Sequence, residues 1–294
     1  MDHLSKKKRQ FLSDVSLLFV AAVWGGGFVA VKGALDTMTP LILMSYRFIM
    51  ATVIMYAFLH KKIGKFTKQD LKNGGVVGTI LFLAFAAQTF GLQYTTASKQ
   101  GFLTATYVVM VPLLYWILYK KRPQHKAFIG SALTIVGIAL VSVNKDMVFN
   151  IGDGLTLLCA LLFAAHIISL EYYTKSMDVL KLSFLQLAVA AVLFTGSAVI
   201  FEPIRFSLSG SEIFAITYLA IFSTFLCFTV QTIAQKYTTS SHASIIMSLE
   251  SVFAALFGVL LLSEVLTPFM LMGCTLIFIA ILIIELDFKF KKKP

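Results

Sequence analysis

The chain has 294 residues, 58% of them hydrophobic, and its mean hydropathy of +0.86 lies far above that of soluble proteins. These values exclude a soluble protein and indicate an integral membrane protein. The formal net charge of +11 would suggest nucleic-acid binding in a soluble protein, but in a membrane protein the position of the charges matters more than their sum, so we expect no nucleic-acid partner.

Apolar segments recur along the whole chain. A helix that crosses a bilayer needs about 20 mainly apolar residues, and ten such segments alternate with short polar breaks. The predicted spans are residues 13–32, 40–59, 73–92, 101–119, 127–143, 153–173, 180–201, 212–235, 242–262 and 268–286. The breaks contain helix-stopping residues, as in Asp36 to Pro40 and at Pro268. The predicted fold class is therefore an all-α integral membrane protein with ten transmembrane helices.

Lysine and arginine concentrate in alternate breaks. With the amino terminus inside, the cytoplasmic side receives the basic clusters at residues 6–9, 61–72, 120–126 and 289–293. This distribution follows the positive-inside rule and predicts an even number of crossings with both termini cytoplasmic. We expect a multi-pass protein of the cytoplasmic (plasma) membrane. The basic and apolar start imitates a signal peptide, but nine further spans follow it, so we expect it to be retained.

The sequence contains an internal repeat. The stretch QYTTAS at 93–98 returns as KYTTSS at 236–241, which is 143 positions later. The same offset aligns Gln88 with Gln231, Thr89 with Thr232, and Gly130 with Gly273. The first helices of the two halves fit at an offset nearer 139, which pairs Trp24 with Phe163 and Lys32 with Glu171. We infer that the chain is a duplication with halves at residues 1–147 and 148–294.

Five predicted spans in each half force the second half to enter the membrane in the opposite sense. The two five-helix repeats are thus expected to be inverted. Inverted repeats allow two nearly equivalent shapes, one open to each side of the membrane, with a binding site at the midplane between the halves. This pattern predicts alternating access.

Four stretches carry a resemblance to a known family: VWGGGFVAVK at 23–32, Tyr46-Arg47-Phe48, GLQYTTASKQGFLTATYVVMVPLL at 91–114, and LESVFAALFGVLLLSEVL at 249–266. The chain resembles the EamA-type family of the drug/metabolite transporter (DMT) superfamily. The resemblance implies a ten-helix carrier for small metabolites such as amino acids, with export favoured and without ATP hydrolysis. The family pattern usually has proline after Glu250, where this chain has Ser251, so a hinge there is not carried over.

Glu250 and Arg47 lie deep inside predicted spans, where a charge costs at least about 2.5–3.5 kcal/mol and is a functional candidate by default. Glu250 lies about 13 Å from the cytoplasmic end of its span at about 1.5 Å per residue. Our hypothesis is that it binds a proton or the amino group of a substrate; the alternative is a structural carboxylate. Arg47 attracts a substrate carboxylate, pairs with a carboxylate of the protein, or extends to the outer interface.

The remaining candidate cavity residues are uncharged or weakly basic. Gln88 and Gln231 are related by the repeat and need hydrogen-bond partners within the bilayer. Trp24 and Tyr107 are candidate aromatic walls. His166 lies in the middle of its span, where a packing role competes with a relay role. No residues here have the spacing of a metal site, and we expect no metal or cofactor.

Other function classes are less well supported. No nucleotide-binding motif is present, so an ATP-driven pump is not expected. The five histidines are scattered, which argues against an intramembrane enzyme. A channel-like facilitator and a non-transporting structural or signalling protein stay open as alternatives. The expected partners are a small-molecule substrate, the lipid bilayer and a proton at Glu250, and a monomer is compatible with the sequence.

Overall fold

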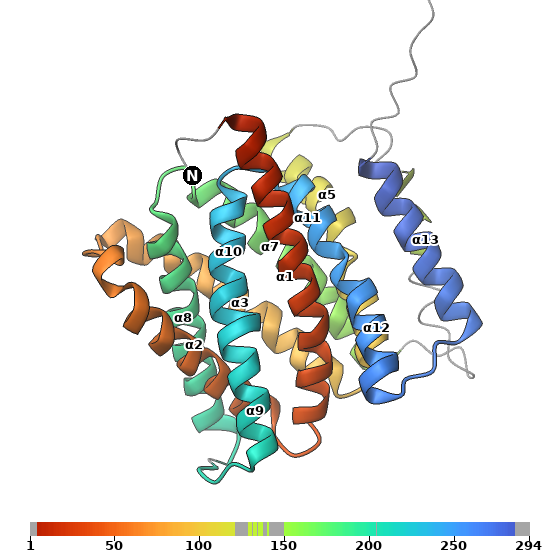
Figure 1. Cartoon of the computed structure of the whole chain (residues 1–294), viewed down its shortest axis with the longest axis horizontal. Helices are drawn as coiled ribbons and strands as arrows, with labels where there is room; N and C mark the ends of the chain where they lie inside the picture. Colours follow the sequence, from red (N-terminus) through yellow and green to blue (C-terminus); the bar gives the residue numbers. More distant parts are fainter. Residues whose placement is uncertain are drawn as a thin grey trace, which may run out of the picture.

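The computed structural model describes residues 5–120, 150–203 and 205–285, together with scattered residues between 129 and 140. Within these residues the regular structure is entirely helical (Figure 1). The helices are α1 (Lys6–Ala34), α2 (Pro40–Ile63), α3 (Lys68–Leu92), α4 (Ala97–Thr104), α5 (Tyr107–Tyr119), α7 (Ile151–Tyr173), α8 (Val179–Phe201), α9 (Gly210–Tyr218), the π-helix η1 (Leu219–Leu226), α10 (Cys227–Gln235), α11 (Ser240–Ser248), α12 (Glu250–Leu262) and α13 (Pro268–Glu285).

Eight helical segments among the described residues are long and apolar enough to cross a membrane. They agree with eight of the predicted spans. The ninth described segment, α13, is a shorter apolar helix at the edge of the bundle (Figure 1). The predicted span at 127–143 lies for the most part outside the described residues. The chain is therefore a multi-pass integral membrane protein.

The repeated motif marks the start of a helix in each half. Thr96 and Thr239 are the N-caps of α4 and α11. Their hydroxyls accept the backbone N–H groups of Lys99 at 3.2 Å and His242 at 3.3 Å. Such a cap satisfies one of the four N–H groups that an α-helix leaves unpaired at its N-terminus. The repeated sequence therefore forms the same kind of helix N-cap in both halves.

Three of the predicted spans are not continuous α-helices, which the sequence analysis did not foresee. The span at 101–119 divides into α4 and α5, and the span at 242–262 divides into α11 and α12. At the two breaks Thr106 and Leu249, 143 positions apart, both have ψ −12° and donate i→i−3 backbone hydrogen bonds. These are tighter 3₁₀-type turns. The third, at 212–235, contains the π-helix η1.

Hydroxyl side chains accompany both breaks. The Thr106 hydroxyl donates to the Leu103 carbonyl oxygen at 2.7 Å, and the Ser251 hydroxyl donates to the Ser248 carbonyl oxygen at 2.8 Å. Hydrogen bonds of this kind compete with the helix ladder and bend helices. The second break thus forms without the proline that the family pattern has after Glu250.

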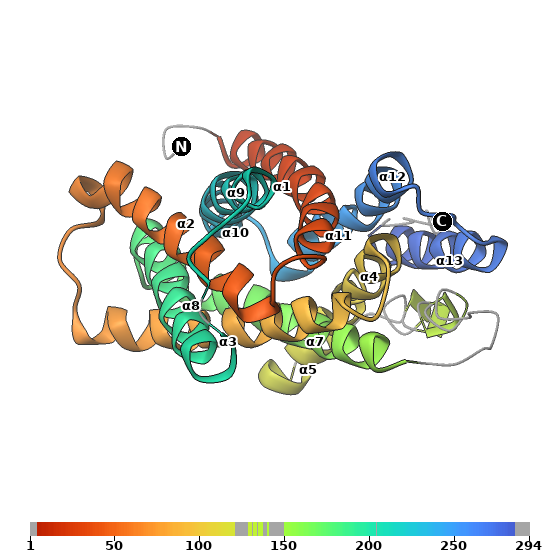
Figure 2. The ribbon, with the colours of Figure 1, turned by 90° about the horizontal axis from the view of Figure 1, so that it is seen from below.

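Helices at corresponding positions of the two halves have corresponding neighbours. Helix α1 packs against α11 and α12, and its counterpart α7 packs against α4 and α5. Helix α3 packs against α7 and α8. In the second half, η1 packs against α1 and α2, and α10 packs against α1. In Figure 2 the helices α1, α2, α3, α7, α8 and α10 surround the middle of the bundle. Lys120 and Ser263, 143 positions apart, end α5 and α12 with positive φ values of 57° and 53°.

Close contact between α1 and α12 depends on a glycine in the Gly25-Gly26-Gly27 run. A Cβ atom added at Gly25 would overlap the Cβ of Phe253 and approach the backbone nitrogen of Ala254 to 2.9 Å. The α1–α12 contact therefore requires the absence of a side chain at Gly25.

We expect Gly25→Ala to lower the stability of the protein by about 1–3 kcal/mol, because α1 and α12 must separate to admit the methyl group. Gly33→Ala is the matched control. It lies on the same helix, and a Cβ atom added there would meet no atom within 4 Å, so it should gain from the higher helix propensity of alanine. Thermal unfolding of the purified proteins in detergent measures both, and equal midpoints would contradict the packing argument.

Candidate functional site

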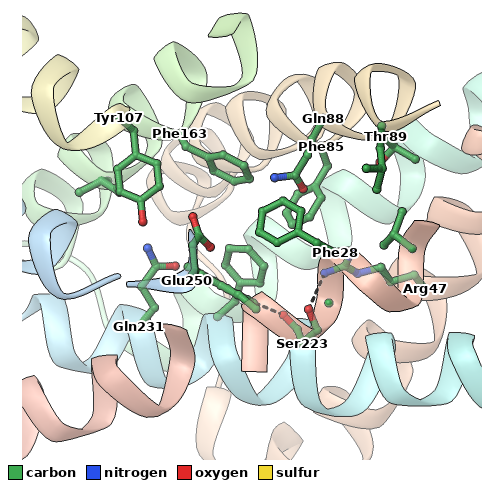
Figure 3. Close-up of a pocket in the computed structure, with 16 residues that line it drawn as sticks. Phe28, Arg47, Phe85, Gln88, Thr89, Tyr107, Phe163, Ser223, Gln231 and Glu250 are labelled. Carbon is green, nitrogen blue, oxygen red and sulfur yellow. Dashed lines mark hydrogen bonds between the residues drawn. The ribbon is translucent and has the colours of Figure 1, made fainter. Parts of the chain in front are cut away.

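A small cavity lies inside the bundle, and both halves of the chain contribute to its wall (Figure 3). Its volume is about 40 Å³, which is room for a few water molecules but not for an organic solute. The lining residues are Trp24, Gly27, Phe28, Val31, Arg47, Phe85, Gln88, Thr89, Leu92, Tyr107, Phe163, Ile167, Ser223, Phe228, Gln231 and Glu250. Six of the seven predicted site residues are in this set, and His166 is not.

Arg47 lies at one side of the cavity, with its side chain fully inside the protein. Its Nε donates to the Thr224 hydroxyl at 2.6 Å, and its Nη2 donates to the Ser223 hydroxyl at 3.0 Å. The guanidinium also lies 4.6 Å from the ring centroid of Phe85, a favourable cation–π distance. The interface-extending alternative is wrong, since Arg47 is only 2% exposed. Among the described residues, no carboxylate forms an ion pair with it.

The π-helix η1 places the two hydroxyls that hold Arg47. Ser223 and Thr224 are consecutive residues of η1, and the Ser223 carbonyl oxygen accepts the Trp24 indole N–H at 2.8 Å. A π-helical turn widens the backbone and is often found at functional sites. One short segment therefore fixes the orientation of both Trp24 and Arg47.

Glu250 lies across the cavity from Arg47 (Figure 3). It is the first residue of α12, and Tyr107 is the first residue of α5. The two residues are 143 positions apart, and each directly follows one of the two helix breaks. The Tyr107 hydroxyl points toward the Glu250 carboxyl in Figure 3. Glu250 is 4% exposed and has no ion-pair partner among the described residues. A buried carboxylate of this kind is costly until a proton or a cation neutralises it.

The two repeat-related glutamines also face the cavity, Gln88 from α3 and Gln231 from α10. The side-chain oxygen of Gln231 and the hydroxyl of Tyr107 are buried without a hydrogen-bond partner among the described residues. Buried polar atoms without partners are rare in proteins. Both residues line the cavity.

His166 lies behind the cavity wall, with its ring 5.9 Å from that of Phe228. Its Nε2 is 2.8 Å from the Gln186 side-chain oxygen, and the Gln186 amide nitrogen donates to the Thr232 hydroxyl at 3.1 Å. Because the Gln186 amide is used as the donor to Thr232, its oxygen accepts, and His166 carries its proton on Nε2. His166 therefore connects α7 to α8 and α10, and the packing interpretation describes it better than a cavity role.

Polar bridges close both ends of the bundle. At the end where α1 stops and α4 starts, here called the Lys99 end, Lys99 pairs with Asp153 at 2.8 Å and Lys32 donates to the carbonyl oxygens of Leu92 and Thr95. At the opposite end, where α1 and α11 start and which we call the His242 end, His242 pairs with Asp14 at 3.1 Å.

Carboxylates complete both closures. Glu264 accepts the backbone N–H groups of Ala97 and Ser98 at the start of α4. Glu171 accepts the N–H and hydroxyl of Ser240 at the start of α11. Negative groups at helix N-termini are stabilised by the helix dipole. Polar contacts therefore join the helices at both ends of the bundle.

Sequence reasoning missed several lining residues. Ser223 and Thr89 were not singled out, although a hydroxyl pair at Ser223-Thr224 inside an apolar span was a usable signal. Phe163 and Ile167 carried no signal, since apolar residues dominate every span. Their position depends on which face of α7 turns inward.

Comparisons with known proteins agree with this architecture. Residues 12–143 and 150–286 each match the sequence model of the EamA-like transporter family. An uncharacterised transporter of Archaeoglobus fulgidus is 37% identical over 278 residues, which cover 95% of this chain and 87% of that protein.

More distant relatives carry functional names. A probable amino-acid metabolite efflux pump of Escherichia coli is 27% identical, covering 95% of this chain and 96% of that protein. An S-adenosylmethionine/S-adenosylhomocysteine transporter of Chlamydia muridarum is 24% identical, covering 90% and 91%. A crystal structure 16% identical in sequence superposes with a TM-score of 0.70 over 96% of this chain and 99% of that chain, which shows a shared fold.

The eight apolar helices, the family match and these relatives identify a multi-pass membrane transporter of small molecules. The two family matches span most of the sequence, so the chain belongs to the EamA-like transporter family within the drug/metabolite transporter superfamily. Proteins of this class move solutes across membranes rather than transform them, in agreement with the expectation that this chain is not an enzyme.

We expect His166→Ala to lower stability by about 2–4 kcal/mol, because it opens a void and leaves the Gln186 oxygen without its donor. Apparent substrate affinity should change little, since His166 does not line the cavity. Replacing both partners, as in His166→Phe with Gln186→Leu, should recover part of the loss. Thermal unfolding and uptake by the same preparations separate the effects; a large rise in KM with normal stability would assign His166 to the substrate.

Proposed function

We propose that this transporter is a secondary carrier that works by alternating access between two inverted halves, residues 1–147 and 148–294. In this proposal the chain crosses the cytoplasmic membrane ten times and both termini are cytoplasmic. The shared caps, helix breaks and packing partners of the two halves support it. So does the central cavity, because inverted repeats form their binding site between the halves.

The substrate class follows from the two charges of the cavity. Arg47 comes from the first half and Glu250 from the second, and aromatic rings lie between them (Figure 3). A zwitterion offers a carboxylate to Arg47 and an ammonium group to Glu250, and each contact neutralises a charge that is otherwise buried without an ion-pair partner among the described residues. We therefore infer that the substrate is an amino acid or a related zwitterionic metabolite.

The name of the Escherichia coli relative, a probable amino-acid metabolite efflux pump, supports this class and favours export as the direction. The unpaired oxygen atoms of Gln231 and Tyr107 beside Glu250 add acceptors for the N–H groups of an ammonium. Phe85, Phe228 and Trp24 limit the size of the side chain that fits between the charges.

Glu250 also gives the proposed cycle a place for a proton. When the site is empty, protonation removes the cost of the buried charge; when an ammonium arrives, the carboxyl releases that proton to water. Exchange of substrate for a proton at one carboxyl couples transport to a proton gradient without any nucleotide.

Replacing Arg47 and Glu250 one at a time tests the substrate assignment. With proteoliposomes and radiolabelled L-amino acids, Arg47→Gln should lower kcat/KM about 10- to 100-fold, the effect of losing one charge-assisted hydrogen-bonded contact. Decarboxylated amine analogues should lose much less, because they never contact Arg47. Glu250→Gln should spare N-acetylated analogues in the same way and should remove the dependence of uptake on a pH gradient.

Two exposed charges supply matched controls for these variants. Lys72→Gln and Asp36→Asn remove one charge each outside the cavity and should transport normally. If Arg47→Gln lowered uptake of all analogues equally, Arg47 would serve the architecture of the site rather than the substrate carboxylate.

Counterflow separates the carrier from the channel alternative. We expect preloading of the vesicles with unlabelled substrate to accelerate entry of labelled substrate and to drive it transiently above equilibrium. A carrier exchanges substrate across an occluded state, whereas a continuous pore does not. The closed ends and the cavity of about 40 Å³ support the carrier. Entry that is insensitive to preloading would contradict it.

A further inference from the structure

The ion pairs at the two ends of the bundle occupy corresponding positions in the two halves. Lys99 and His242 are 143 positions apart, and Asp14 and Asp153 are 139 positions apart, the two offsets of the internal repeat. Lys99 and His242 are each the third residue of a helix capped by threonine. Each pairs with an aspartate near the start of the first helix of a half, α7 or α1.

The two pairs differ in chemistry. Lysine keeps its charge throughout the physiological pH range, whereas histidine is the side chain that changes charge between about pH 5 and pH 8. The repeat has thus placed a lysine at one end and a histidine at the other. Only the charged form of histidine forms an ion pair with a carboxylate.

The two pairs also differ in their access to water. The side chains of Lys99 and Asp153 are 5% and 0% exposed, and those of His242 and Asp14 are 27% and 28% exposed. The His242 pair is thus partly accessible, while the Lys99 pair is buried. The residue types and the exposed fractions therefore both make the His242 pair the more responsive of the two to pH.

Several charged and titratable side chains lie near the His242 end among the described residues. Helix α11 packs against α1, α5, α7 and α13. The titratable or charged residues that these helices and the adjoining turns bring to this end are Lys7, Lys8, Arg9 and Asp14 of α1, Tyr115 and Tyr119 of α5, Glu171, Tyr172 and Tyr173 of α7, Cys274 of α13, and Lys175, Lys236 and Tyr237. Arg9 and Lys236 lie over the Tyr237 ring, and Glu171 is bound to Ser240 and Lys175. Asp14 is the carboxylate paired with His242.

We propose that His242 and Asp14 form a proton-binding site that holds the His242 end of the transporter closed when a proton is bound. The Lys99–Asp153 pair joins the opposite end without a histidine. The inference rests on the proposed alternating access, in which each end must open in turn, and in the proposed topology the His242 end faces the cytoplasm.

The direction of the pH effect follows from the charges. With a proton bound, the imidazolium of His242 attracts the Asp14 carboxylate, and the starts of α1 and α11 stay together. When that proton passes to water, the attraction is lost and this end opens more readily. The proton concentration on one side of the membrane thereby regulates one closure and leaves the other unchanged.

Labelling of a buried reporter thiol by N-ethylmaleimide tests the proposal without any substrate. The native Cys159, Cys227 and Cys274 are first replaced by alanine, and Ser244→Cys supplies the reporter. Ser244 is fully buried, one helical turn beyond Ser240 on α11. Rates are measured on the purified full-length protein at about pH 5.5 and about pH 8.5, on either side of the histidine range.

For each protein we take the labelling rate at high pH divided by the rate at low pH. Dividing this ratio by the same ratio for the His242→Lys variant gives a quotient in which the pH dependence of the thiol itself cancels. We expect the quotient for the reporter protein to be about five, the factor expected of a partly exposed ion pair. Asp14→Asn should label rapidly at both pH values and give a quotient near one. A reporter at the Lys99 end, Ala97→Cys, should also give a quotient near one.

A quotient near one in the Ser244→Cys protein with Asp14 and His242 intact would overturn the proposal. If His242→Lys fails to fold, the same division by the Asp14→Asn ratio decides. Persistence of the pH effect in Asp14→Asn would also overturn it, since the ion pair is then not the cause. Labelling does not require transport of any substrate. Its result can therefore be told apart from a failure of the proposal that the substrate is a zwitterion.

Discussion

The backbone N–H groups at the starts of α4 and α11 set the constraint on which the rest of the structure depends. A helix N-terminus within a membrane bundle leaves up to four N–H groups without partners, and no lipid can accept their hydrogen bonds. Thr96 and Thr239 each accept one, and Glu264 and Glu171 accept others. Glu171 belongs to α7 and Glu264 to the segment between α12 and α13, so satisfying the helix starts also joins distant parts of the chain at the bundle ends.

The interior of the bundle differs from its ends, because its two charged side chains have no ion-pair partners among the described residues. Arg47 is held by two hydroxyls and an aromatic ring, and Glu250 begins a helix immediately after a break. Such an arrangement is stable enough to fold but becomes better satisfied when a ligand of opposite charge enters. The cost of burial and the capacity to bind a zwitterion therefore have the same origin.

Much of the fold could be predicted from hydropathy and charge, since eight of the ten predicted spans coincide with long apolar helices. Six site residues, among them Arg47, Gln88 and Glu250, line one cavity. Two features could not be predicted: the breaks at Thr106 and Leu249, and the π-helix at Ser223. The pattern of apolar residues does not show which carbonyl oxygen accepts a given hydroxyl or amide hydrogen. His166 was misplaced for a related reason: its partner, Gln186, lies on another helix.

The sequence by itself determined that the protein spans a membrane, that its halves are related by fixed offsets, and which few polar residues must find partners in the bilayer. Those conclusions need only composition, spacing and the cost of burying charge. Tertiary structure alone decided which partners are found: Lys99 with Asp153, Asp14 with His242, Arg47 with Ser223 and Thr224. Such pairings depend on helix rotation and on contacts between residues far apart in the chain, which a linear pattern does not contain.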